Sequence, residues 1–213
     1  MVLRSFALDS SEHRVNQGVD VRIGEIDTFA IVRKDVTGAF VLPPSNFDPE
    51  PGFPEARAVI SAVRQALDAT RPARVVCVST IGAQAPRSNL LSQRTLLEEA
   101  LSTLPLPVTF LRPAWFMENC SWDVPQARDT GVISSFLQPL DKPVPMVATA
   151  DVGRVAAELL EESWTGRRVV ELEGPTRVTP NQIAATFAEV FRHPVRAQAV
   201  PRQRGNNCSS HRA

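Results

Sequence analysis

The sequence predicts an α/β fold built around a mainly parallel sheet. Two observations carry this prediction. Short apolar segments typical of strands alternate with amphipathic segments of helical period, and one of the apolar segments is nearly continuous, as in a strand covered on both faces. Strands that alternate with helices of about 10 to 15 residues imply right-handed crossovers between parallel neighbours. We therefore expect a parallel sheet with helices packed on it.

Five segments have the length and β-branched content of strands. They are Val19–Ile23, Gly38–Pro43, Arg74–Ser79, Pro107–Pro113 and Arg168–Gly174. The third of them, RVVCVS, is the nearly continuous apolar segment. The residues immediately before it, RPAR, carry two charges, and we expect them to form a solvated corner between a helix and a strand.

Four segments show helical features. Pro54 suits the first turn of one helix, and Thr179, Pro180 and Gln182 together form the start signal of another, with a capping box. The apolar stripes of the first three helices lie at Val59, Ile60, Val63 and Leu67, at Leu90, Leu97 and Leu101, and at Val152, Val155, Ala156, Leu159 and Leu160.

The composition excludes several classes of protein. Hydrophobic residues make up 43% of the 213 residues and charged residues 22%, as in a globular protein. The 23 basic residues balance the 23 acidic ones, so we expect no nucleic-acid partner and no acidic membrane partner. No apolar run reaches the roughly 20 residues of a membrane span. The three cysteines are far apart and show no disulfide or zinc spacing, which favours a cytoplasmic protein.

The pattern also predicts how the chain is divided. Strands and helices alternate through residues 1–130, and the alternation weakens in the proline-containing stretch that begins near Gly131. We expect a smaller α+β lobe over 131–201, some elements of which return to the sheet. The tail 202–213 has no hydrophobic period and is expected to be disordered.

Several segments, in the same order along the chain, resemble the NmrA-like family of atypical short-chain dehydrogenases/reductases. They include RVVCVSTIGA, PVTFLRPAWFMENC, TADVGRVAAELL and GPTRVTPNQIA. The resemblance implies a Rossmann-like domain that binds NADP or NAD. No GxGxxG turn is present in the sequence, so we expect that the first βα unit is missing, and that the chain is truncated at its N-terminus and also at its C-terminus. An exposed sheet edge would then favour self-association.

By this resemblance, residues that follow the strands bind the cofactor. Glu25 and Ile26 stand beside the adenine ring, and Arg4 or Arg14 reaches a 2′-phosphate. Arg94 stands where relatives carry a lysine near the nicotinamide ribose. The further cofactor residues that the resemblance implies are Leu42, Pro43, Pro44, Ser79, Thr80 and Pro113. The missing glycine turn removes most of the pyrophosphate binding that such a fold supplies.

The resemblance assigns Trp115, Phe116 and Asn119 to the substrate pocket. A buried hydrophobic cluster at the start of a helix explains the two aromatic residues equally well. No catalytic residue is identified, because the sequence contains no tyrosine and an arginine at position 94 cannot donate a proton at neutral pH. The histidines and cysteines show no metal-binding pattern.

Other polar residues have plain structural interpretations. Arg94 and Glu98 are four residues apart, which predicts an exposed ion pair along a helix face. Asp151 suits the first turn of a helix, and Cys120 is expected to be a packed, unreactive thiol.

Three functions follow from these observations. The first is an NAD(P)H-dependent oxidoreductase that acts on a small-molecule substrate such as a quinone. The second is a non-catalytic sensor of the cofactor's redox state that acts through protein partners, and the missing proton donor favours it. The third is a truncated product with no independent activity.

Overall fold

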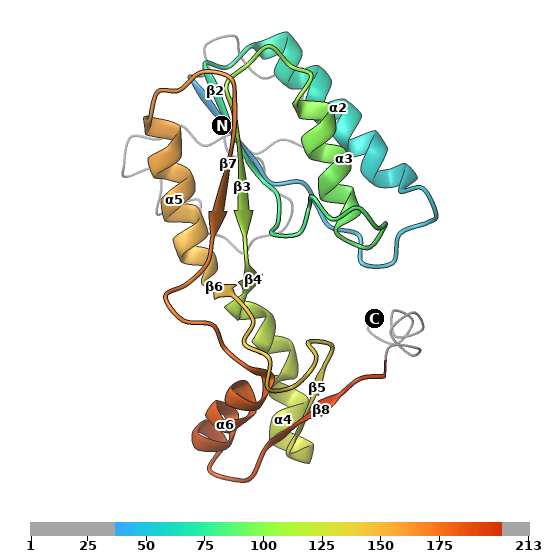
Figure 1. Ribbon diagram of the computed structural model, residues 1–213, viewed down its shortest axis with the longest axis vertical. Helices are drawn as coiled ribbons and strands as arrows, with labels where there is room; N and C mark the ends of the chain where they lie inside the picture. The colour runs from blue at the N-terminus through green and yellow to red at the C-terminus, as the bar shows by residue number, and fades with distance from the viewer. Residues whose placement is uncertain (1–36, 202–213) are drawn as a thin grey trace. The chain divides into compact units, whose positions relative to one another are not determined.

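The computed structural model describes residues 37–201, which are coloured in Figure 1. The expected strand Val19–Ile23 lies outside this range. The described elements, in chain order, are β1 (Gly38–Val41), α2 (Pro54–Thr70), β2 (Arg74–Val78), α3 (Ser92–Leu101), β3 (Val108–Pro113), β4 (Trp115–Phe116), the 3-10 helix η2 (Met117–Asp123), α4 (Val124–Thr130), β5 (Val132–Ser135), β6 (Met146–Val147), α5 (Thr149–Glu161), β7 (Arg167–Leu172), α6 (Pro180–Phe191) and β8 (Arg196–Ala199).

The predicted α/β fold with a parallel sheet is confirmed. Four strands form one sheet in the order β1-β2-β3-β7, and every neighbouring pair in it is parallel. The central strand β2 is buried from Val75 to Val78, as its continuous apolar sequence predicts. Each of these four strands corresponds to an expected segment, with ends that differ by one or two residues.

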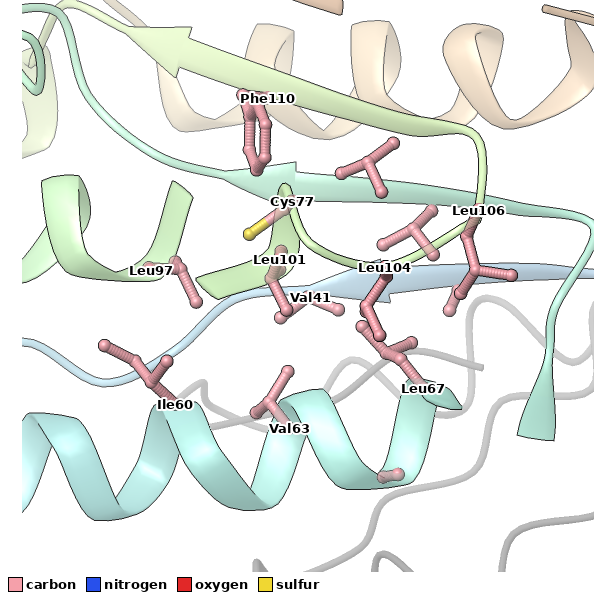
Figure 2. Close-up of a cluster of buried hydrophobic side chains, with 14 residues drawn as sticks. Val41, Ile60, Val63, Leu67, Cys77, Leu97, Leu101, Leu104, Leu106 and Phe110 are labelled. Carbon is pink, nitrogen blue, oxygen red and sulfur yellow. The ribbon is translucent and has the colours of Figure 1, made fainter. Parts of the chain in front are cut away.

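Helices α2 and α3 pack side by side on one face of the sheet (Figure 1). The stripe of α2 buries Ile60, Val63 and Leu67, as its period predicts. Helix α3 buries Leu97 and Leu101 but begins at Ser92, so Leu90 lies before the helix and is 40% exposed. Figure 2 shows these side chains pointing toward Val41, Cys77 and Phe110 of the strands, together with Leu104 and Leu106 from the turn after α3.

Residues 153–161 of α5 lie on the opposite face of the sheet (Figures 1 and 2). Arg74, at the start of β2, donates hydrogen bonds of 2.8 and 2.7 Å to the carbonyl oxygens of Leu160 and Glu162. The last carbonyl groups of a helix have no partner within the helix, and a basic side chain can satisfy them. The expected solvated corner is therefore wrong for Arg74, because this side chain caps α5.

The described chain divides into two compact units. The first contains residues 37–113 and Gly153–Leu172, and the second contains Ala114–Val152 and 173–201. The sequence pattern places the start of the smaller lobe at residue 131, whereas the second unit starts at Ala114, because η2 and α4 pack with each other and α4 packs with β5 and α6.

The second unit has its own small core. The buried residues Ala127, Ile133 and Ala184 come from α4, β5 and α6, and Phe187 and Phe191 stack at 5.6 Å beside them. Helix α6 begins with the predicted capping box, in which the Thr179 hydroxyl accepts from the backbone N–H of Gln182 and the Gln182 side chain accepts from the backbone N–H of Thr179. Such a box satisfies two backbone donors that the helix itself leaves unpaired.

Candidate functional site

The parallel strands of the first unit bring their carboxyl ends to one edge. In the register of the sheet, Val41 lies opposite Cys77, and Val78 lies opposite Leu111. Beyond β2 the pairing continues, because the backbone N–H of Ser79 donates to Leu111 O at 2.7 Å and that of Ile81 donates to Pro113 O at 3.1 Å. Open parallel sheets bind their ligands outside the carboxyl ends of the strands.

Six of the residues that the sequence assigns to the cofactor lie at this edge, namely Leu42, Pro43, Pro44, Ser79, Thr80 and Pro113. Pro44 is exposed, Leu42 and Thr80 are half-buried, and Pro43, Ser79 and Pro113 are buried. Arg4, Arg14, Glu25 and Ile26 lie outside the described residues. That any of these residues binds a cofactor stays a prediction.

Helix α3 fastens the loop that follows β1. Nη2 of Arg94 donates to Pro43 O at 2.9 Å and to the Ser45 hydroxyl at 2.6 Å. The neighbouring Gln93, which is 7% exposed, donates to Asn46 O at 2.8 Å. Burial lowers the pKa of Arg94, but a guanidinium remains charged at neutral pH. A small hollow beside Arg94 is lined by Pro43, Pro44 and apolar side chains of α2 and α3.

The expected exposed ion pair between Arg94 and Glu98 is wrong. Glu98 pairs instead with Arg112 of β3, through bonds of 2.9 and 2.7 Å to its two carboxylate oxygens, and the side chains are only 12% and 13% exposed. Arg94 points its Nη2 toward the loop after β1. The pattern along one helix could not reveal a partner that comes from a strand fourteen residues away.

The Glu98 carboxylate also accepts a hydrogen bond from the hydroxyl of Ser79. Ser79 therefore donates its hydroxyl proton to Glu98, and not to a ligand at the edge. The bidentate contact with Arg112 favours the ionised carboxylate, which has no proton to give. Neither group can act as a general acid in this arrangement, so the geometry offers no catalytic acid in addition to those that the sequence excludes.

The residues assigned to the substrate pocket lie in the second unit. Trp115 and Phe116 form β4, which pairs with β6, and the backbone N–H of Trp115 donates to Pro145 O at 3.3 Å. Trp115 is 41% exposed, and Phe116 and Asn119 are half-buried. Their role in binding a substrate stays a prediction.

Two further features of residues 37–201 bear on function. No group of three or more His, Cys, Asp or Glu side chains in this range is placed to hold a metal ion. Of the helices described here, none combines the length and the apolar character needed to cross a bilayer. Cys120 is half-buried, and burial together with the nearby Asp123 raises the pKa of its thiol, which agrees with an unreactive side chain.

A family comparison agrees with this arrangement. The model of the NmrA-like family matches residues 59–208, which is more than half of the 213 residues. The chain belongs to the NmrA-like family. The resemblance on which the sequence analysis rests is thereby confirmed.

This NmrA-like chain is also similar to a curated enzyme, the (4-alkanoyl-5-oxo-2,5-dihydrofuran-3-yl)methyl phosphate reductase of Streptomyces griseus. The two sequences are 33% identical over 104 residues. The match covers 48% of this chain and 36% of the reductase, so the chain aligns with little more than a third of that relative.

Solved structures of similar fold include two reductases. One is an NADPH-dependent quinone oxidoreductase from Escherichia coli, complexed with NADPH, with a TM-score of 0.74 and 19% identity over 91% of this chain and 67% of the other. The second is the Citrobacter sp. triphenylmethane reductase, complexed with NADP(H), with a TM-score of 0.70 and 20% identity over 94% of this chain and 69% of the other. These similarities show that the NmrA-like chain has a Rossmann-like α/β fold.

The sequence analysis missed three residues that shape the edge. Gln93, Thr95 and Arg112 are ordinary helix and strand residues in the sequence, yet each holds a loop at the carboxyl end of the sheet: Gln93 binds Asn46 O, Thr95 binds Ala83 O, and Nη1 of Arg112 binds the Gln84 side chain at 3.1 Å. A buried glutamine, 7% exposed, has no signal in a single sequence. Only the packing of α3 against the loops reveals these contacts.

Proposed function

We propose that this NmrA-like chain is an NAD(P)-dependent oxidoreductase that reduces small electrophiles such as quinones. The observation that carries the proposal is the gathering of the segments after β1 and β2 with the end of β3 along one sheet edge. Family membership and the fold shared with an NADPH-dependent quinone oxidoreductase support it. The reductase that is 33% identical over part of its length adds further support.

The cofactor is assigned to this edge. Its nicotinamide end would lie near Pro43, Ser79 and Pro113, with Leu42, Pro44 and Thr80 beside it. Arg94 would contribute by charge and by holding the loop after β1. Arg4, Glu25 and Ile26 are assigned to the adenosine end from the family resemblance alone, and so are the substrate contacts of Trp115, Phe116 and Asn119.

A bound reduced nicotinamide would supply the hydride. The residues at the edge would orient it and exclude water from one face, while the proton needed by the reduced product would come from solvent. A quinone suits such a site, because its reduced form needs little help from an acid. The absence of tyrosine from the sequence and the arginine at position 94 make a substrate that requires a protein acid a poor fit.

Binding and turnover can be measured separately. Titration of the purified chain with NADPH and with NADH, followed by nucleotide fluorescence or calorimetry, tests cofactor binding and the choice between the two. Quinones are then added, and the loss of NADPH absorbance measures turnover. Failure to bind either nucleotide at millimolar concentration would overturn the proposal.

A second candidate is a sensor that binds the cofactor and catalyses nothing. The ion-paired state of Glu98 and the absence of a protein acid favour it. Binding of NADPH without turnover of quinones or of a dihydrofuranone phosphate would identify the sensor. The affinities for NADPH and NADP⁺ would then be expected to differ.

A further inference from the structure

The ion pair of Glu98 and Arg112 connects the ends of three strands. Arg112 belongs to β3, Glu98 binds the Ser79 hydroxyl at the end of β2, and Nη1 of Arg112 lies 3.7 Å from the carboxylate of Glu171 on β7. In the sheet, Arg112 and Glu171 are register partners. A single guanidinium therefore lies between two carboxylates, one from α3 and one from the neighbouring strand.

The same pair restrains the loop that follows β2. Glu98 holds the first loop residue, Ser79, and Arg112 holds Gln84 by a bond of 3.1 Å to its side-chain oxygen. Between these two points, the hydroxyl of Thr95 donates to Ala83 O. Residues 79–84 are thus fixed at both ends and near one end by groups that lie on α3 and β3.

Stability alone is a weak explanation for this arrangement. Burying two charged groups costs desolvation energy, and apolar residues of similar volume commonly give an equally stable or more stable core. A bidentate contact between an arginine and a carboxylate fixes orientation, because both groups are planar and two bonds define their relation. Hydrogen bonding of the charged pair to a loop transfers that fixed orientation to the loop.

We propose that Glu98 and Arg112 are positioning residues, which hold the loop 79–84 in the shape that the cofactor edge requires. This assignment rests on the proposed function. Neither residue needs to touch the cofactor or the substrate: they act through Ser79 and Gln84. The shape of the edge after β2 then depends on the charge of Glu98 and on both bonds of the guanidinium.

Two conservative variants of the full chain test this role. Glu98→Gln keeps an acceptor for Ser79 and removes the charge, and Arg112→Lys keeps the charge and removes the bidentate contact. The matched control is Glu158→Gln, which makes the same chemical change in an exposed pair with Arg154 at 2.9 Å on α5. NADPH affinity is measured by fluorescence titration, and hydrogen exchange is measured for the amides of residues 79–84.

We expect both variants to weaken NADPH binding by about tenfold, the factor that corresponds to the loss of one hydrogen bond to a charged group. Exchange in residues 79–84 should quicken, while exchange in the centre of β2 stays slow. Glu158→Gln should leave both the affinity and the exchange of this loop within about twofold of the parent chain, because exposed pairs contribute little.

Three other results would overturn the assignment. Unchanged NADPH affinity in Glu98→Gln and in Arg112→Lys would show that the pair does not position the site. Faster exchange spread over β2 and α3, with affinity unchanged, would show a purely structural pair. If the parent chain itself binds no NADPH, the proposed function fails and the positioning role fails with it, a result distinct from the first two.

Discussion

Single residues in this protein take their chemistry from where the fold places them. Cys77 illustrates this, since it lies on β2 with 0% of its surface exposed, in the core that α2 and α3 cover. Burial raises the pKa of its thiol to about 12, an effect that Glu98 increases and the nearby Arg94 cation partly offsets. The thiolate is the reactive form of cysteine, so this side chain should be inert in the folded protein.

We therefore expect Cys77 to resist thiol-specific alkylation at pH 8 in the native chain and to react readily in denaturant. The physical reason is twofold: the group is inaccessible, and its high pKa leaves it protonated. Alkylation followed by peptide mass spectrometry measures each cysteine separately. Half-buried Cys120 provides the internal comparison and should be modified sooner. Rapid native modification of Cys77 would contradict the packing described here.

Whole elements depend on side chains distant in sequence. Helix α5 begins at Thr149, whose backbone N–H donates to both carboxylate oxygens of Glu118 at 2.9 and 3.1 Å and whose hydroxyl donates at 2.8 Å. Burial by itself would raise the pKa of Glu118, but the bonds from Thr149 outweigh it, so the pKa is lowered from 4.5. A carboxylate at the start of a helix satisfies free N–H groups and complements the helix dipole.

The lowered pKa defines a pH dependence. A carboxyl group whose folded pKa is below its unfolded value of about 4.5 stabilises the protein fully above that pH, and the stabilisation is lost as the pH falls through the folded pKa. Glu118→Gln should therefore lower the free energy of unfolding by about 0.5–1 kcal/mol at pH 7, and the difference should disappear near pH 3.

Urea denaturation at several pH values measures this difference. Glu189→Gln on α6, at an exposed position, is the control and should differ from the parent chain by less than about 0.5 kcal/mol at every pH. A constant difference for Glu118→Gln between pH 3 and pH 7 would mean that its carboxylate charge does not support α5.

At the scale of the whole molecule, the proposed function has a consequence for stability. The chain leaves the first unit after Pro113 and returns at Gly153, so the four-stranded sheet is completed by β7, a strand late in the sequence. A ligand that binds the edge of this sheet binds only when the sheet is assembled. Any such ligand must stabilise the folded chain by mass action.

NADPH at one hundred times its dissociation constant should therefore raise the free energy of unfolding by about 2.7 kcal/mol. For a chain of this size, the melting temperature should rise by roughly 5–10 °C. Thermal melting followed by circular dichroism measures the shift, and adenosine at the same concentration is the control. Size-exclusion chromatography of the same samples tests the expected self-association. An unchanged melting temperature at saturating NADPH would argue against binding at the edge.

The alternation of apolar segments and helical periods was sufficient to predict β1, β2, β3 and β7, three helices beside them, and the capping box of α6. The short elements β4, η2 and α4 were not predicted, since two paired residues or a single turn of 3-10 helix leave no periodic pattern. The prediction for Arg94 and Glu98 failed for a related reason. A four-residue spacing describes neighbours on a helix surface, and this surface is covered by β3 and two loops.

The sequence by itself determined the fold class, the family and the absence of a tyrosine acid, because these depend on residue types and on their order. Only the tertiary structure decided which polar groups meet. Ser79, Glu98 and Arg112 come from three different elements, and their contact follows from the parallel register of the strands and the packing of α3. Contacts of that kind arise from packing in three dimensions, which spacing along a single chain does not encode.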